Sequence, residues 1–359
     1  MGALLATPCR SPVNEPLCLG GMWALENRTP YAVGKSWVRD QAGKHLWLVA
    51  VKATFDIGRG GKLSLAREQM PVSLQPEFWG DPFTTSLRSD ADVVPIKATT
   101  DVLLEGSAYA PHGRATRSVP VTLRVGGLQK SLVVYGPRVY FRSMGTLAIS
   151  SPVAFEVQPI RYEHAFGGAD LESAEPSEHR YDARNPVGRG VVSRTEKLID
   201  QPAHSVEHAD GSAQRAPAGF GPIASFWSPR RERAGTYGEQ WEKTRKPLLP
   251  ADYDERHLQC APEDQWSARH LYGGEPVALL NLSPHGPLQF ALPKISLVFA
   301  TRFGSRREIH QGRLGTVLIQ PDVDRLQLVW QTALPVSGRD VDYLDETVID
   351  EKPHLEVSE

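Results

Sequence analysis

The clearest pattern in the chain is an alternation of side chains in two long runs, residues 45–57 and residues 325–332. In the first run both alternating sets, which begin with Leu46 and Trp47, are largely apolar. A strand that is apolar on both faces is typical of the middle of a sheet. In the second run leucines and a tryptophan form one face, and the other face is mostly glutamine. We therefore expect two long strands that lie deep in a β structure.

Shorter runs of strand type recur about every 8–12 residues on both sides of the middle of the chain. Pro120 lies within one of these runs, and because proline cannot donate to a neighbouring strand, we expect that strand at a sheet edge. This spacing is typical of sandwiches and barrels, in contrast to alternating strands and helices. The runs cover residues 101–109, 118–125, 129–135, 153–157, 277–282, 288–292, 295–299 and 316–320.

Regular periodicity is nearly absent from the central segment, which we define as residues 161–270. Glycine, proline and aromatic residues recur there in tight clusters, as at Phe166, Phe220 and Trp227. Disordered segments are poor in aromatic residues, so we interpret this segment as an ordered, irregular structure that packs on the strands. The predicted fold class is mainly β: one or more antiparallel β-sandwiches, a long irregular segment rich in Gly, Pro and aromatic residues, and a few short helices. Helices are expected at residues 238–245 and 252–258.

The pattern divides the chain into five consecutive regions. The first lacks periodicity, and the last is acidic with few apolar anchors, so we expect a loose arm and a frayed tail at the two ends. The regions are an N-terminal arm (residues 1–22), an N-terminal β-rich region (23–160), the central segment (161–270), a C-terminal β-rich region (271–344) and an acidic tail (345–359). Whether the two β-rich regions form one domain or two is left open by the pattern.

Composition narrows the classes of partner. The net charge is −2, so no overall field favours nucleic acid or an anionic membrane, and neither is an expected partner. The sequence contains no apolar run of about 18 residues, so no membrane-spanning helix is expected. The first ten residues lack the basic start and the apolar core of a signal peptide. The three cysteines form no even set and no Cys-x-x-Cys pair, which favours the reducing cytoplasm.

The sharpest enzymatic candidate is the order His204-x-x-Glu207-His208, which matches one class of zinc peptidase. That chemistry needs both histidines on one helical face, with the glutamate as base. Pro202 precedes the motif and Gly211 follows it closely, so a helix is not expected there. A polar surface loop is the preferred interpretation, and a metal-dependent hydrolase remains the alternative.

Other polar clusters have plain structural interpretations. Asp252 and Asp254 have no calcium-loop spacing, and one or the other is expected to cap a short helix. Cys260 follows His257 without a second ligand pair, which favours a buried thiol beside a surface histidine. His164 is expected to be hydrogen-bonded within an ordered turn. No cofactor is expected.

The motifs of the central segment resemble those of one bacterial family of unknown function, which is encoded in type VI secretion clusters. The resemblance covers nearly the whole chain and is specific only when the motifs are taken together. The matching pieces are residues 162–168 (YEHAFGG), 185–190 (NPVGRG), 217–223 (PAGFGPI), 227–230 (WSPR), 234–237 (AGTY), Trp241, 245–252 (RKPLLPAD) and 261–265 (APEDQ).

The resemblance implies a cytoplasmic, non-enzymatic adaptor or chaperone that binds a type VI effector and helps to load it onto the VgrG spike or a PAAR-like protein. Because aromatic and arginine side chains dominate interface energetics, we expect Trp227, Arg230, Tyr237 and Trp241 as contact anchors. Truncation of Trp227 or Arg230 to alanine is expected to abolish binding without unfolding. A carbohydrate-binding β-sandwich is a further alternative. The residues expected to form the partner-binding or motif platform are Tyr162, Glu163, His164, Phe166, Asn185, Arg189, Phe220, Trp227, Arg230, Tyr237, Trp241, Asp252, Asp254 and Asp264.

Overall fold

The two longest alternating runs lie side by side in one sheet. In the computed structural model, which describes residues 23–211 and 215–352, β3 (His45–Ile57) pairs antiparallel with β24 (Arg325–Val336), from Asp56 opposite Arg325 to His45 opposite Val336. Both strands have a neighbour on their other side, which confirms the prediction that they are central.

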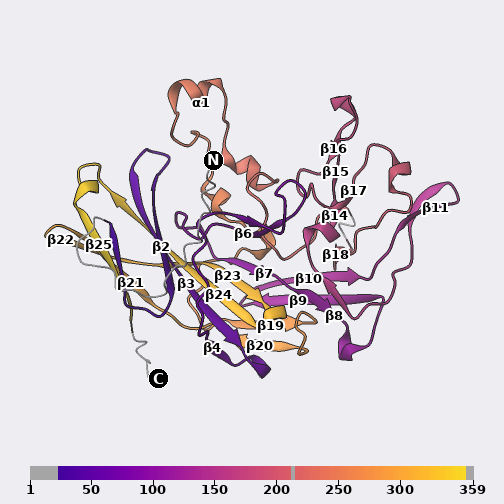
Figure 1. Cartoon of the computed structure of the whole chain (residues 1–359), viewed down its shortest axis with the longest axis horizontal. Helices are drawn as coiled ribbons and strands as arrows, with labels where there is room; N and C mark the ends of the chain where they lie inside the picture. The colour runs from indigo at the N-terminus through magenta and orange to yellow at the C-terminus, as the bar shows by residue number, and fades with distance from the viewer. Residues whose placement is uncertain (1–22, 212–214, 353–359) are drawn as a thin grey trace, which may run out of the picture.

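Strands from both β-rich regions build this six-stranded sheet, in the order β2-β3-β24-β23-β7 with β4 beside β3. The pair β23–β7 is parallel, and the other pairs are antiparallel. Figure 1 shows the early indigo strands and the late yellow strands lying next to one another. Residues 23–160 and 271–344 are thus interleaved. The additional strands are β2 (Ala32–Arg39), β4 (Leu63–Leu65), β7 (Asp101–Leu104) and β23 (Arg313–Gln320).

A five-stranded antiparallel sheet has the order β18-β10-β9-β19-β20, and its strand β9 carries Pro120. The expected edge position is wrong, because β9 is the middle strand. The proline is tolerated because pairing with β19 ends at Thr122, beyond which the Pro120 carbonyl accepts a hydrogen bond from Asn281 Nδ2 at 2.8 Å. The five strands are β18 (Val206–His208), β10 (Leu128–Tyr135), β9 (Ser118–Val125), β19 (Pro276–Leu280) and β20 (Leu288–Ala291).

A four-stranded sheet, in the order β1-β25-β21-β22, contains the beginning of the expected acidic tail. The prediction of a frayed tail from Asp345 is wrong, because β25 (Leu344–Glu351) pairs on both sides. Its Leu344, Thr347 and Ile349 are fully buried while acidic residues lie between them, so the charge concealed a strand. The other strands are β1 (Ala24–Asn27), β21 (Leu297–Phe303) and β22 (Arg306–Gln311). The expected arm and residues 353–359 lie outside the described residues.

One apolar core joins the three large sheets. Alternate residues of β3, such as Trp47 and Val49, pack in the same cluster as Leu123 of β9 and Phe299 of β21. The sheets therefore meet through their apolar faces, as expected for a mainly β protein with antiparallel sheets. Within the described part of the chain, no helix is long and apolar enough to cross a membrane.

Short elements complete the fold, many of them in the central segment. The expected strand at residues 153–157 is displaced, since β13 begins only at Val157. The expected helix near 238–245 is α1 (Glu239–Thr244), the one α-helix among the described residues, and residues 252–258 form only a 3-10 turn. The two-stranded pairs are β5 (Glu77–Phe78) with β6 (Leu87–Ser89), β8 (Ser107–Tyr109) with β13 (Val157–Pro159), β11 (Tyr140–Ser143) with β12 (Thr146–Ile149), β14 (Phe166–Gly167) with β17 (Arg189–Gly190), and β15 (Ala169–Asp170) with β16 (Arg180–Tyr181). The 3-10 turns are η1 (Arg59–Gly61), η2 (Pro111–Gly113), η3 (Tyr162–His164), η4 (Pro176–Glu178), η5 (Thr195–Leu198), η6 (Arg230–Ala234), η7 (Glu255–Leu258), η8 (Glu263–Gln265), η9 (Pro321–Val323) and η10 (Val341–Tyr343).

Candidate functional site

The six-stranded sheet has a second buried face, on which polar side chains lie among apolar ones such as Leu48 and Val329. Lys52 of β3 and Gln327 and Gln331 of β24 are buried there, on the face opposite the apolar core. The long loop that follows β4 covers them: Lys52 Nζ lies 2.8 Å from Asp92, and Gln331 Nε2 donates to the Asp92 carbonyl at 3.0 Å. Buried polar groups need such partners. Cavities remain where loop and sheet do not close on one another.

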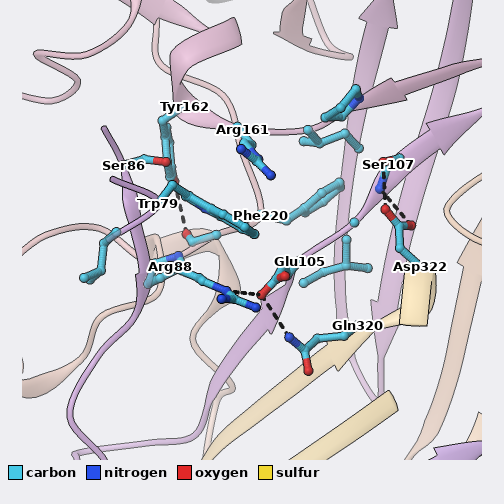
Figure 2. A pocket seen from close by; sticks show the side chains of 18 of the residues that line it. Trp79, Ser86, Arg88, Glu105, Ser107, Arg161, Tyr162, Phe220, Gln320 and Asp322 are labelled. Carbon is cyan, nitrogen blue, oxygen red and sulfur yellow. Dashed lines mark hydrogen bonds and ion pairs between the residues drawn. The ribbon is translucent and has the colours of Figure 1, made fainter. Parts of the chain in front are cut away.

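One of these cavities, which we call the Trp79 cavity, has a volume of about 270 Å³. Figure 2 shows how side chains from distant parts of the chain converge on it. It lies between the β5–β6 hairpin, the end of β7, the segments around Arg161 and Phe220, and the end of β23. The polar and aromatic residues that line it are Trp79, Ser86, Arg88, Glu105, Ser107, Arg161, Tyr162, Phe220, Gln320 and Asp322.

Two arginines flank the indole of Trp79. The guanidinium carbon of Arg161 lies 3.7 Å from the ring centroid, and that of Arg88 lies 4.7 Å away. Figure 2 shows the two groups on either side of the ring. A guanidinium against an indole is stabilised by the quadrupole of the ring and by dispersion. Trp79 thereby positions two cations at the cavity wall.

Two carboxylates on the opposite wall have their own partners. Glu105 accepts a hydrogen bond from Gln320 Nε2 at 2.9 Å and lies 3.7 Å from Arg88 Nε. Asp322 accepts from the Ser107 backbone N–H at 3.1 Å and from its hydroxyl at 2.7 Å. It also accepts from the Tyr109 hydroxyl at 2.9 Å. These bonds hold the acidic groups in fixed places.

The floor of the Trp79 cavity is aromatic and rigid. Phe220 is fully buried, and its carbonyl accepts from the Leu104 backbone N–H at 3.2 Å and from Gln265 Nε2 at 2.9 Å. Tyr162 is also buried, and burial raises the pKa of its hydroxyl well above the usual range. A side-chain carbon at position 219 would lie 3.0 Å from the Tyr162 ring, so any residue larger than glycine there would have to displace the ring slightly. The PAGFGPI motif thus forms a backbone that fits closely around the tyrosine.

Glu163 and Arg230 attach the loop that carries Trp79 to the central segment. The Glu163 carboxylate accepts from the Ser86 backbone N–H at 2.9 Å and from the Ser86 hydroxyl at 2.7 Å. Arg230 Nη1 lies 2.9 Å from Asp90 and donates to the Ile223 carbonyl at 2.6 Å. The same guanidinium also donates twice to the His257 carbonyl. The motif residues therefore brace the cavity wall from behind.

Asn185 and Trp227 support the segment beneath the Trp79 cavity. Asn185 is fully buried, and its Nδ2 donates to the carbonyls of Tyr162 at 2.8 Å and Phe166 at 3.0 Å. Trp227 is only 1% exposed and packs edge-on against the Tyr162 ring. The expectation that Trp227 and Arg230 contact a partner directly is wrong, since both are interior residues. Their clustering with Gly and Pro reflects packing of the irregular backbone.

The remaining motif residues lie away from the Trp79 cavity. His164 and Arg189 line a second cavity of about 410 Å³, and the Phe166 ring meets His204. His164 Nδ1 hydrogen-bonds the Pro159 carbonyl at 3.0 Å within the turn η3, which confirms its predicted local role. Burial lowers the pKa of its imidazole.

Tyr237 and Trp241 belong to an arm that projects from the sheets and carries α1 (Figure 1). Their rings pack edge to face with centroids 4.8 Å apart. Asp252 holds the base of this arm through the Thr236 backbone N–H at 2.9 Å and hydroxyl at 2.7 Å. The arm is thus a separate feature from the Trp79 cavity.

The other two acidic platform residues also have structural partners. Asp254 caps η7 by accepting from the Arg256 backbone N–H, which confirms the predicted capping role. Asp264 pairs with Lys130 Nζ at 2.9 Å. Neither residue lines the Trp79 cavity.

The His204–His208 stretch is neither a helix nor a surface loop. His204 is 5% exposed, and the motif ends in strand β18 because it extends the five-stranded sheet. His204 contacts the Tyr140 hydroxyl at 3.0 Å and Glu207 at 3.1 Å, whereas His208 Nε2 meets the Pro217 carbonyl at 3.0 Å. Burial would raise the pKa of Glu207, but hydrogen bonds from His204 and from a neighbouring arginine hold it below its usual value. The described residues contain no group of three or more His, Cys, Asp or Glu side chains that could hold a metal ion.

Several residues of the Trp79 cavity were not predicted as site residues. The signal for Trp79 was present, because residues 78–82 (FWGDP) place aromatics beside glycine and proline, as the central segment does. Arg88, Glu105, Gln320 and Asp322 carry no such local signal. They join the site only because β6, β7 and the end of β23 converge there.

A further cavity, of about 220 Å³, adjoins the Trp79 cavity and shares Arg88, Glu105 and Gln320 with it. Its inner end holds Lys97, whose Nζ lies 2.7 Å from Asp101. The Cys260 thiol is buried beside this ion pair, as predicted, and burial raises the pKa of the thiol to about 12. A thiol in that state is not a nucleophile at neutral pH.

Fold and site together define a mainly β protein whose irregular central segment braces a preformed polar and aromatic cavity. Residues 42–331, more than half of the chain, match the family described as uncharacterized proteins conserved in bacteria (DUF2169), and the chain belongs to this family. No curated protein and no solved structure matches the chain.

Proposed function

We propose that this protein is a non-enzymatic adaptor or chaperone of a bacterial type VI secretion system. It acts in the cytoplasm, binds an effector and helps to load that effector onto the VgrG spike or a PAAR-like protein. The resemblance of the motifs in the central segment suggests this role. The family match supports the resemblance at the level of an uncharacterized bacterial family.

The observation that carries the proposal is that motif residues bind the hairpin whose loop, between β5 and β6, carries Trp79. Glu163 holds Ser86, which immediately precedes β6 of the hairpin, and Arg230 holds Asp90, which immediately follows β6. Because this strand of the hairpin is already held at both of its ends, less conformational entropy is lost when a partner binds. A recognition protein benefits from a contact surface that is already in place before the partner binds, and these motif residues hold the cavity wall in place.

Aromatic side chains beside the cavity extend the contact surface beyond the cavity itself. Phe78 and Phe226 stack with centroids 6.0 Å apart, and Phe226 is 44% exposed. Phe83, at the tip of the same hairpin, is 83% exposed. Exposed aromatics around a concave site favour a protein segment as ligand, since they bury more area than a small molecule would cover.

The test is co-purification with the products of adjacent genes. Tagged wild-type protein is expected to capture an effector or a PAAR-like protein that is co-expressed with it. Trp79→Ala should abolish this capture because it removes the platform for both arginines, and a thermal melt should show that the variant remains folded. Tyr343→Ala, which removes an exposed aromatic outside the cavity, serves as the matched control.

The outcomes of this experiment separate clearly. If wild-type protein captures none of the neighbouring gene products, the adaptor proposal is wrong. If Trp79→Ala is folded and captures them as well as the control does, the Trp79 cavity is not the contact site. Trp227→Ala and Arg230→Ala are unsuitable for this test, because both side chains are interior and their loss would unfold the wall.

A further inference from the structure

Arg161 differs from the other charged residues that line the Trp79 cavity. Glu105, Asp322 and Arg88 each have a hydrogen-bond or ion-pair partner in the cavity wall. The Arg161 side chain forms neither a hydrogen bond nor an ion pair with any residue in 23–211 or 215–352, and its contact is with Trp79. Figure 2 shows its guanidinium directed toward the cavity. A guanidinium carries five N–H donors, and here the described residues supply no acceptor for them.

The position of Trp79 limits what kind of ligand fits beside Arg161. Guanidinium groups flank the indole, so a nucleobase or sugar ring has no free face on which to stack. The floor, formed by Leu104, Ile160 and Phe220, is apolar. The site therefore offers N–H donors next to a small apolar pocket. A carboxylate with a short apolar group beside it matches both features.

The charge of the opposite wall selects among anions. Glu105 and Asp322 line the cavity, and both already accept hydrogen bonds from the protein, so they do not need a cation from the ligand. Their negative charges also repel a ligand that carries a large negative charge. Like charges at close range are destabilising, and the repulsion grows with the charge of the ligand. A singly charged carboxylate is favoured over a doubly charged phosphate.

We propose that the Trp79 cavity binds a carboxylate presented by a partner protein, with Arg161 as the main donor and Arg88 as a second cation. This inference rests on the proposed adaptor function, because it takes a protein segment as the ligand. The carboxylate is either the C-terminal group of that partner or an acidic side chain. Both sources share the chemistry that a guanidinium fork recognises.

The test uses small probes and ligand-observed NMR on the full-length protein. N-acetyl-L-leucine represents a C-terminal carboxylate, and N-acetyl-L-glutamic acid α-amide represents an acidic side chain. N-acetyl-L-leucinamide is the uncharged match of the first probe, and inorganic phosphate is the dianion. We expect one of the two acids to bind saturably, and the amide and phosphate to bind about tenfold or more weakly. The acid that binds more tightly identifies the source.

Variants connect this binding to Arg161. Arg161→Gln should weaken acid binding about tenfold or more. The affinity of Arg161→Lys should lie between those of the wild type and Arg161→Gln, because lysine keeps the charge and loses the paired N–H donors of the guanidinium. Since the Arg161 side chain makes no hydrogen bond within the described protein, both variants should remain folded, with at most the small loss that follows from a weaker contact with Trp79. Arg302→Gln is the matched control, because it removes an exposed arginine that pairs with Glu346 on another sheet.

Several results would overturn the inference. Equal binding of acid and amide, stronger binding of phosphate, or unchanged acid binding in folded Arg161→Gln would each exclude a carboxylate site at Arg161. If Arg161→Gln no longer binds the acid but still captures the effector fully, the carboxylate site does not take part in partner recognition. The adaptor function would then still hold. Acid binding by a wild-type protein that captures no neighbouring gene product would leave the carboxylate site and exclude the adaptor function.

Discussion

In the six-stranded sheet, β3 and β24 pair over their lengths and send alternate apolar side chains into the shared core. In the central segment the longest strand, β18, has three residues, and buried side chains bond directly to backbone carbonyls. In the central segment, the side chains of Asn185, Arg230 and Gln265 donate the hydrogen bonds to backbone carbonyls that a neighbouring strand donates in a sheet. Each buried carbonyl needs a donor, and where no strand ladder supplies one, a buried side chain can, as Arg230 does for the Ile223 and His257 carbonyls.

Because of this difference, the two regions should lose stability for different reasons when a buried side chain is truncated. A truncation in the sheet leaves a cavity that neighbours can partly fill. A truncation of a buried donor in the central segment removes a hydrogen bond from one or more buried carbonyls, and repacking of apolar neighbours does not replace it. Single polar residues of the central segment should therefore matter as much as large apolar residues of the core.

The largest effect is expected for Arg230→Ala. It removes the donor to the Ile223 and His257 carbonyls and leaves Asp90 without its partner. The free energy of unfolding should fall by about 4 kcal/mol, as for other broken buried pairs. Urea denaturation measures it, with Leu328→Ala as the core comparison, expected at about 3 kcal/mol. An Arg230→Ala loss under half that of Leu328→Ala would break the comparison.

Acid should weaken the sheet region through His310 of β22. Burial lowers the pKa of His310 from 6.5 to about 4, and its ring nitrogens bond to Thr332 and Thr301. The unfolded chain takes up a proton first as pH falls, so stability present above pH 6.5 is lost progressively down to pH 4. The loss is at most about 3 kcal/mol. His310→Gln should flatten this part of the pH–stability curve, and an unchanged curve would contradict the assignment.

A smaller effect is expected for Asn185→Ala, which sharpens the comparison at a site with no charge. The variant leaves the Tyr162 and Phe166 carbonyls without their side-chain donor. We expect a loss of about 2 kcal/mol in the free energy of unfolding. Hydrogen exchange should show faster opening of residues near η3, while amides of β3 and β24 keep their protection. Uniform loss of protection would mean that the segment does not open separately.

The smallest effect is expected for Asp254→Asn in the exposed turn η7. The amide oxygen can still cap the Arg256 backbone N–H, and only an ion pair with the exposed Arg256 side chain is lost. Stability should fall by less than about 1 kcal/mol. A larger loss by thermal or urea denaturation would show that surface charges, in addition to buried donors, hold the central segment.

Local pattern predicted the long strands well. The alternation in β3 and β24 depends on neighbouring residues and on nothing remote, so it could be interpreted directly. The short α1, the cap at Asp254 and the buried Cys260 were predictable for the same reason. The strand β25 was missed because acidic residues surround its buried Thr347 and Ile349, and a register shift after Leu344 interrupts the alternation.

The burial of Trp227 and Arg230 could not be predicted from composition. Aromatic and arginine side chains serve equally at interfaces and inside irregular structures, and only their surroundings decide between the two. Arg230 is buried because Asp90 and the His257 carbonyl, from other parts of the chain, converge on it together with the nearer Ile223 carbonyl. The same convergence explains why the Trp79 cavity was not anticipated.

The amino-acid order of this protein carries its strand periodicity, its β class and the presence of an ordered, glycine-rich middle, because these depend on steric and hydrophobic preferences over a few residues. Tertiary structure alone placed Arg161 against Trp79, and Gln320 against Glu105. Such contacts depend on which chain segments meet after the sheets close around a common core. No local preference specifies that meeting, since it results from the sum of many weak contacts across the whole fold.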